Sequence, residues 1–178
     1  MDYGYVCFSY TKNELIAKLI CKITQSKWSH SFIIVPPVLG KEMVMEAASN
    51  GISMATFEEN YRNNPNESYE VYRFNAPQGK IDKSVLNCME RLERPYPYME
   101  LLWFVWRRTN KVFGRDIKNQ NNWFTNGVVC SGLVRKFIEG AGFKKLFRGF
   151  GIDAVAPEDA YEIVLAKTQL FELIEKKD

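Results

Sequence analysis

Short runs of β-forming residues fill the first half of the chain and predict a sheet. Strands are expected at residues 4–9, 29–35, 43–48, 52–57 and 69–74. Pro36-Pro37 end the second of these strands, Gly40 allows a turn and Asn50-Gly51 is a turn signal, so we expect antiparallel strands with short connections. Residues 58–68 are polar and rich in asparagine, which predicts a loop.

A helix is expected between the first two strands. Apolar residues recur three and four positions apart from Leu15 to Ile23, which is the spacing of an amphipathic helix of about three turns. Thr11 and Glu14, just before it, have the spacing of a capping box. The pattern therefore predicts that the chain passes from the first strand to the second through a capped helix.

The second half of the chain has mainly helical spacing. Helices are expected at residues 82–93, 99–112 and 130–142 and from Pro157 onward, and a last strand at residues 171–174. Gly142 suits a helix end, and Pro157 followed by two acidic residues suits a helix start. Residues 114–125 and 144–155 are predicted loops. The chain shows no internal repeat and no linker, so residues 1–178 are predicted to form a single α+β domain, an antiparallel sheet packed against helices.

Composition and charge narrow the class of protein. Of the 178 residues, 46% are hydrophobic and 25% are charged, which is typical of a globular domain and excludes a disordered or collagen-like chain. The net charge is only +3, whereas a nucleic-acid-binding domain usually carries a strong basic excess, so we expect no nucleic-acid partner. The sequence does not indicate an oligomeric state.

Hydropathy bears on the expected location of the protein. The longest stretch without a charged side chain, residues 119–134, is shorter than the ~20 apolar residues that a membrane-spanning helix needs. The first ten residues lack the basic and apolar regions of a signal peptide. We therefore expect a cytoplasmic protein with no membrane span.

Cysteine and histidine counts limit the chemistry. The four cysteines are widely spaced without a CxxC motif, and His30 is the single histidine. A disulfide framework is not expected in a chain without a secretion signal. Zinc sites need several closely spaced ligands, so we expect neither a metal nor another cofactor. Any mechanism that uses an imidazole must use His30.

Cys130 is the cysteine best placed to react. A thiol is a nucleophile as the thiolate, and its pKa falls at a helix N-terminus and beside an imidazolium. Cys130 lies at a predicted helix start, and the small residues Ser131 and Gly132 after it leave backbone N–H groups open to a carbonyl oxygen. The alternative is a buried thiol with a purely structural role, because free cysteine is among the most buried residue types.

His30 and Glu46 are candidates for the groups that activate a thiol. His30 opens a predicted strand, and Glu46 is the one polar residue on the face of the next strand that it shares with Val44 and Ala48. A carboxylate among apolar residues must be paired or functional, and a histidine base needs such an orienting partner. The alternative is that His30 is half exposed without a role and that Glu46 is solvated at the end of the sheet.

Taken together, the motifs resemble those of the circularly permuted papain-like hydrolases, the YiiX-like relatives of the NlpC-type cell-wall peptidases. The resemblance rests on W-S-H at 28–30, M-E-A at 45–47, N-G-I at 50–52, V-C-S-G-L-V at 129–134 and P-E-D at 157–159. In the permuted group the histidine strand comes first and the cysteine helix last. The order His30, Glu46, Cys130 matches that pattern.

The resemblance implies a permuted papain-like fold and a thiol hydrolase of amide (peptide or isopeptide-like) or ester bonds. It assigns Cys130 as the nucleophile, His30 as the base and Glu46 as the orienting residue. Tyr96 and Tyr98 match a tyrosine-bearing stretch of such proteins and, with Ser131, are candidates for substrate binding; core packing is the alternative for the two tyrosines. The expected substrate is a peptide or an amidated or acylated small molecule.

Departures from the family pattern shape these expectations. Relatives that act on peptidoglycan usually carry an export signal or a wall-binding module, so a cytoplasmic substrate, or a protein encoded by a phage or mobile element, fits better. The lecithin:retinol acyltransferase-like group usually keeps a second histidine, which this chain lacks. Two alternatives to a hydrolase remain: an acyltransferase that uses the same site, and a binding or inhibitory module that keeps the fold without the chemistry.

Overall fold

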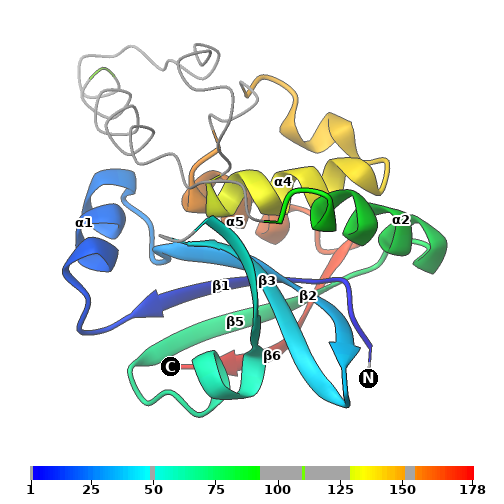
Figure 1. The fold of residues 1–178 in the computed structure, drawn as a ribbon. Coiled ribbons are helices and arrows are strands. Elements are labelled where there is room, and N and C mark those ends of the chain that lie inside the picture. The colour runs from blue at the N-terminus through cyan, green and yellow to red at the C-terminus, as the bar shows by residue number, and fades with distance from the viewer. Residues whose placement is uncertain (1, 49–50, 93–109, 111–128, 151–154) are drawn as a thin grey trace.

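A six-stranded antiparallel sheet forms the centre of the fold (Figure 1). The computed structural model describes residues 2–48, 51–92, 110, 129–150 and 155–178. The strand order is β4-β3-β2-β1-β5-β6, and every pairing is antiparallel, as the sequence predicts. The strands are β1 Tyr5–Thr11, β2 His30–Val38, β3 Lys41–Ala48, β4 Gly51–Thr56, β5 Glu67–Phe74 and β6 Phe171–Lys177.

Helices cover mainly one face of this sheet. The α-helices are α1 Leu15–Thr24, α2 Gln78–Met89, α4 Cys130–Gly140 and α5 Pro157–Ala166. Two shorter turns are the π-helical η1 Glu58–Arg62 and the 3-10 helix η2 Lys144–Phe147. Figure 1 shows α2, α4 and α5 on one side of the sheet and η1 on the other. Among the described residues, no helix is long and apolar enough to cross a membrane.

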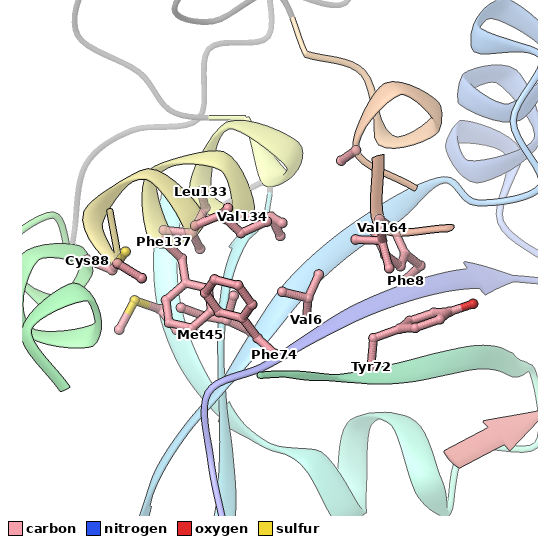
Figure 2. Packing of buried hydrophobic residues seen from close by; sticks show 14 of the residues in the cluster. Val6, Phe8, Met45, Tyr72, Phe74, Cys88, Leu133, Val134, Phe137 and Val164 are labelled. Carbon is pink, nitrogen blue, oxygen red and sulfur yellow. The ribbon is translucent and has the colours of Figure 1, made fainter. Parts of the chain in front are cut away.

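Alternation along the strands gives the sheet an apolar layer on each face. On β2, Ile33 and Val35 belong to a large cluster on the side of α4, whereas Phe32 and Ile34 belong to a smaller cluster on the side of η1. In the large cluster, side chains of the sheet meet Phe137 and its neighbours on α4 (Figure 2). Burying one such side chain stabilises the fold by about 1.5–3 kcal/mol, so this cluster fixes α4, and with it Cys130, across the sheet.

Several expected elements differ from the structure. The capping box is wrong: β1 extends to Thr11, whose hydroxyl donates to Glu67 Oε1 at 2.5 Å, and Glu14 caps α1 without a side-chain hydrogen bond. The expected loop at 58–68 instead contains η1 and the first residues of β5, because Tyr61 is an apolar anchor inside this polar segment and is buried in the smaller cluster.

The second half of the chain follows the expected pattern more closely. Cys130 begins α4, as predicted, and Pro157 begins α5. The carboxylate of Asp159 caps α5 by accepting from the Ala156 N–H at 2.8 Å. The expected loop at 144–155 contains the 3-10 helix η2. The predicted loop at 114–125 and all of the predicted helix at 99–112 but Asn110 lie outside the described residues, so the single domain over 1–178 stays a prediction.

Gly4 offers a test of how tightly α2 packs under the sheet. It has a φ of +85°, and a Cβ at this position would lie 2.4 Å from Ile81 Cγ2. We expect Gly4→Ala to lower the free energy of unfolding by about 1–3 kcal/mol in urea titrations, through backbone strain and overpacking. The matched control is Gly79→Ala in α2, where a Cβ meets nothing within 4 Å. If both variants have the same urea midpoint as the parent protein, the close packing of Gly4 against Ile81 is wrong.

Candidate active site

Cys130 is held at the N-terminus of α4. Cys130 is 5% exposed, and it follows Val129, which has an extended backbone. The sulfur accepts hydrogen bonds from the backbone N–H groups of Ser31 and Ser131. The side chain of Ser131 is fully buried and donates to the Val155 carbonyl at 2.5 Å. The hydroxyl that was a candidate for substrate binding thus anchors the start of α4 to the segment before α5.

His30 and Glu46 lie on neighbouring strands and contact each other. In the β2–β3 pairing, Phe32 is opposite Glu46, so His30, two residues earlier, lies diagonally across on the same face. His30 Nε2 and Glu46 Oε2 are 2.9 Å apart. Their side chains are 22% and 13% exposed, so little water competes for this contact. Glu46 is paired, as the pattern of its strand requires, rather than solvated at the end of the sheet.

The imidazole of His30 has two partners in the site, Glu46 and Cys130. Nε2 is used by Glu46, and the imidazole also forms a hydrogen bond with Cys130. Nδ1 is the ring nitrogen that Glu46 leaves free for a second partner. The structure therefore brings Cys130, His30 and Glu46 into one cluster, with the imidazole in the middle.

The charges in this cluster favour an ion pair. Burial by itself lowers the pKa of His30 and raises that of Cys130. The hydrogen bond and the opposite charges that the two groups share outweigh burial, so the pKa of His30 is raised and that of Cys130 is lowered. Glu46 adds to the first shift. Together these directions favour a thiolate beside an imidazolium, the state in which a cysteine is a nucleophile.

The other three cysteines have the opposite environment. Burial raises the pKa of Cys7 far above its ordinary value, that of Cys88 to about 12 and that of Cys21 to about 11. His30 is not among the groups that shift the pKa of these three thiols. Among the four thiols, Cys130 is therefore the one that the structure activates.

Tyr61 is a member of the site that the sequence analysis missed. Its hydroxyl donates to Glu46 Oε2 at 2.6 Å, the same oxygen that contacts His30. Its ring stacks on Phe32 with centroids 4.1 Å apart. Burial and the carboxylate of Glu46 raise the pKa of Tyr61 well above its usual value, so it stays a proton donor to Glu46. Its position inside a polar, asparagine-rich segment gave no reason to single it out.

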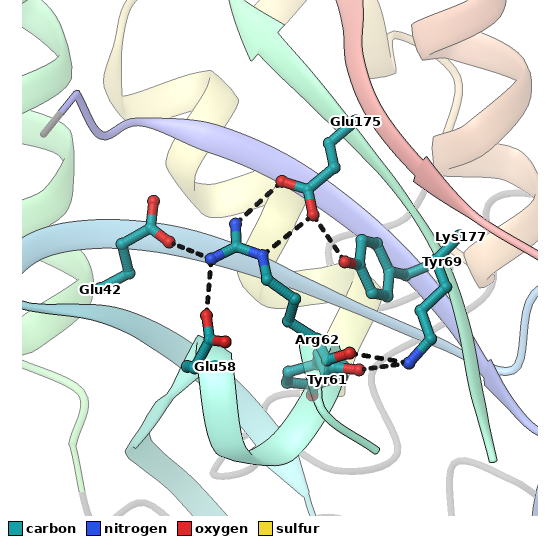
Figure 3. A network of polar contacts seen from close by, with 7 residues as sticks. All are labelled: Glu42, Glu58, Tyr61, Arg62, Tyr69, Glu175 and Lys177. Atoms are coloured by element: carbon teal, nitrogen blue, oxygen red, sulfur yellow. Dashed lines mark hydrogen bonds and ion pairs between the residues drawn. The ribbon is translucent and has the colours of Figure 1, made fainter. Parts of the chain in front are cut away.

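The turn that carries Tyr61 is clamped by the C-terminal strand (Figure 3). Lys177 donates to the backbone carbonyls of Tyr61 and Arg62 at 3.1 and 2.9 Å. Arg62 in turn donates to Glu175 through Nε at 3.1 Å and Nη2 at 2.9 Å. Its Nη1 also donates to Glu42 and Glu58, each at 2.8 Å. Residues at the end of β6 thus fix the turn whose hydroxyl holds Glu46.

Two of the candidate residues cannot be placed. Tyr96 and Tyr98 lie outside the described residues. Their suggested contact with substrate stays a prediction.

Comparison with known proteins supports the fold. No family model and no curated protein sequence matches the chain. The crystal structure of the metalloprotein YiiX from Escherichia coli O157:H7 matches over 99% of this chain and 97% of that chain, with a TM-score of 0.57 and 15% sequence identity. At this identity the likeness concerns the fold alone. The chain has a YiiX-like α+β fold built on an antiparallel sheet.

The described residues do not fit a metal ion at this cluster. Across the described parts of the chain, no group of three or more His, Cys, Asp or Glu side chains is arranged to hold an ion.

Selective alkylation tests the ion pair. We expect iodoacetamide at neutral pH to modify Cys130 far faster than Cys7, Cys21 or Cys88, because only its pKa is lowered. Cys130→Ser should lower the pKa of His30 by ~1–3 pH units, since it removes the negative charge that stabilises the imidazolium. Peptide mapping and the NMR titration of the single imidazole measure the two effects. If the pKa of His30 is the same in Cys130→Ser as in the parent protein, the ion pair between His30 and Cys130 is wrong.

Replacing Tyr61 tests its hold on Glu46. The hydrogen bond from Tyr61 lowers the pKa of Glu46. Tyr61→Phe should therefore raise that pKa, so that in acid less of Glu46 is ionised to support the imidazolium. The acid side of the alkylation profile of Cys130 should then move up by ~0.5–1 pH unit, the equivalent of one hydrogen bond. The matched control is Tyr72→Phe, which removes a buried hydroxyl that donates to Glu70. Equal profiles for both variants would show that Tyr61 is only a packing residue.

Proposed function

We propose that the protein is a cysteine hydrolase that cleaves an amide or ester bond through Cys130, His30 and Glu46. The observation that carries this proposal is the position of His30, which contacts the thiol of Cys130 and lies 2.9 Å from Glu46. A nucleophile, a base in contact with it and a third group that orients the base are the parts that such catalysis needs. The raised pKa of His30 and the lowered pKa of Cys130 support the same roles.

The reaction follows from these positions. The Cys130 thiolate attacks the carbonyl carbon, and the backbone N–H groups of the first turn of α4, which lack intrahelical acceptors, stabilise the oxyanion. His30 gives its Nδ1 proton to the leaving amine or alcohol as the bond to carbon breaks, which leaves an acyl-thioester. His30 then takes a proton from water, whose oxygen attacks the thioester and releases the acid and the thiolate. Glu46 keeps the imidazole oriented through both steps.

The arrangement also supports a finer description of the fold, that of a permuted papain-like hydrolase. The histidine strand β2 precedes the cysteine helix α4 in the chain, and α4 packs against β2 and β3. The chain order is the one expected of the permuted group. Cys130, His30 and Glu46 then occupy the nucleophile, base and orienting positions of that group.

A covalent intermediate provides the test. The protein is mixed with a panel of 4-nitrophenyl esters and anilides, and intact-mass spectrometry follows the acyl adduct while released nitrophenol or nitroaniline gives the rate. We expect an adduct on Cys130 that Cys130→Ala abolishes. Cys21→Ala, a partly exposed thiol with a raised pKa, is the matched control and should keep the parent rate.

The two supporting residues should differ in effect. His30→Ala should lower turnover by ~10²–10⁴-fold, the usual contribution of a general base, and Glu46→Gln by less, since it only orients that base. Added amines or alcohols that consume the acyl-enzyme faster than water would indicate an acyltransferase. An adduct that survives in Cys130→Ala contradicts the proposal. A parent protein that forms no adduct also contradicts it and favours a binding module.

A further inference from the structure

A pocket of about 520 Å³ opens beside His30 and Glu46. Its walls come from α1, from the ends of β1 and β3, and from the turn that carries Tyr61. Cys130 is not among the residues that line it. His30 and Glu46 are the members of the cluster that line this pocket.

One wall of the pocket is apolar. It consists of residues of α1, among them Ile16 and Leu19, which are each 55% exposed. Large aliphatic side chains left open beside a cavity gain from contact with an apolar group, at about 25 cal/mol per Å² of apolar surface covered. This wall fits an aliphatic chain.

The other walls of the pocket are acidic. The carboxylates that line the pocket are Glu14, Glu46, Glu59 and Glu67, and no Lys or Arg is among its described lining residues. Glu46 is paired with His30, and Glu59 is 3.4 Å from Lys41. Apart from the imidazolium of His30, a positive charge inside the pocket would have to come from a ligand.

Glu67 is the residue that most needs such a charge. It is 6% exposed, and although Thr11 donates to its Oε1, its Oε2 has no hydrogen-bond partner in the described part of the chain. A buried carboxyl oxygen without a partner is costly. Burial and the neighbouring charges of Glu14 and Glu46 raise its pKa, while Thr11 and His30 oppose this. An ammonium group in the pocket supplies the missing donor once the carboxyl group rotates toward it.

The position of the pocket indicates which part of a substrate it holds. In the proposed reaction His30 protonates the leaving group, so that group departs along the imidazole. We propose that this pocket binds the leaving group and that the leaving group is an aliphatic amine that carries a second, positively charged amine, as in a diamine. That the diamine is released from an acyl group rests on the proposed function. That the pocket binds a diamine rests on the pocket alone.

In that reaction the atoms balance as for any amide. The bond between the acyl carbon and the amine nitrogen breaks, the acyl carbon bonds to Cys130 Sγ, and the His30 proton goes to the departing nitrogen. The aliphatic chain then runs along α1, and the distant ammonium lies near Glu67 and Glu14. Water completes the cycle by hydrolysing the thioester.

Binding is measured with 1,5-diaminopentane and, as the uncharged match of equal length, 1,5-pentanediol. The protein carries Cys130→Ser so that no chemistry occurs, and the NMR signals of His30, the single imidazole, report entry into the pocket. We expect saturable shifts with the diamine and at least tenfold weaker binding of the diol. Equal binding of the two ligands, or no saturable shift, overturns the proposal.

Variants locate the charge recognition. Glu67→Gln should weaken diamine binding at least tenfold and leave the diol unchanged. The exposed Glu14→Gln should weaken it several-fold, and it keeps the test decisive if Glu67→Gln does not fold. Glu172→Gln, an exposed carboxylate on β6 paired with Arg73, is the matched control and should bind like the parent. Parent-like binding in folded Glu67→Gln or in Glu14→Gln overturns the role of the acidic wall.

The outcomes also separate this proposal from the function on which it builds. Slow alkylation of Cys130 together with selective diamine binding would defeat the hydrolase and keep the pocket. Fast alkylation without diamine binding would do the reverse. If both hold, diamine amides should be cleaved faster than amides of an uncharged alkylamine of the same length.

Discussion

The position of the His30 imidazole is the constraint on which the rest of the site depends. It contacts a thiol from a helix on one edge and a carboxylate from a strand on the other. The charges of Cys130, His30 and Glu46 are shielded from water, and removing a charge from water is costly. They are therefore stable only when each has its partners in place. The register of β2 against β3 and the packing of α4 across the sheet must therefore both be correct before the ion pair can form.

That requirement extends to the end of the chain. Tyr61 holds the carboxylate that holds the imidazole, and its turn is fixed by Lys177 and by the pairing of Arg62 with Glu175. The interactions of Arg62 and Lys177 are partly exposed, and such ion pairs contribute little to stability one by one. Their value is geometric, since several of them act on a single five-residue turn. A strand at the far edge of the sheet thus takes part in orienting the cluster.

The sequence carried the parts of the site that depend on local patterns. Cys130 could be predicted because small residues and helical spacing follow it, and Glu46 because it interrupts an apolar strand face. Tyr61 could not, because an aromatic residue in a polar segment acquires its partner only when that segment folds back beneath β2 and β3. The capping box failed for a similar reason: the hydroxyl of Thr11 is used by Glu67, which lies far away in the sequence and reaches it through the β1–β5 pairing.

Two acids near one histidine, the half-buried Glu46 and the buried Glu67, behave differently. Glu46 accepts hydrogen bonds from both His30 and Tyr61, and these outweigh burial, so its pKa is lowered. Glu67 receives one hydrogen bond from a neutral hydroxyl and lies near other carboxylates, so burial prevails and its pKa is raised. The first acid is complete within the fold and suits a fixed role beside the base. The Oε2 of the second lacks a donor in the described part of the chain, and that difference makes Glu67 the group of the pocket that a cationic ligand can satisfy.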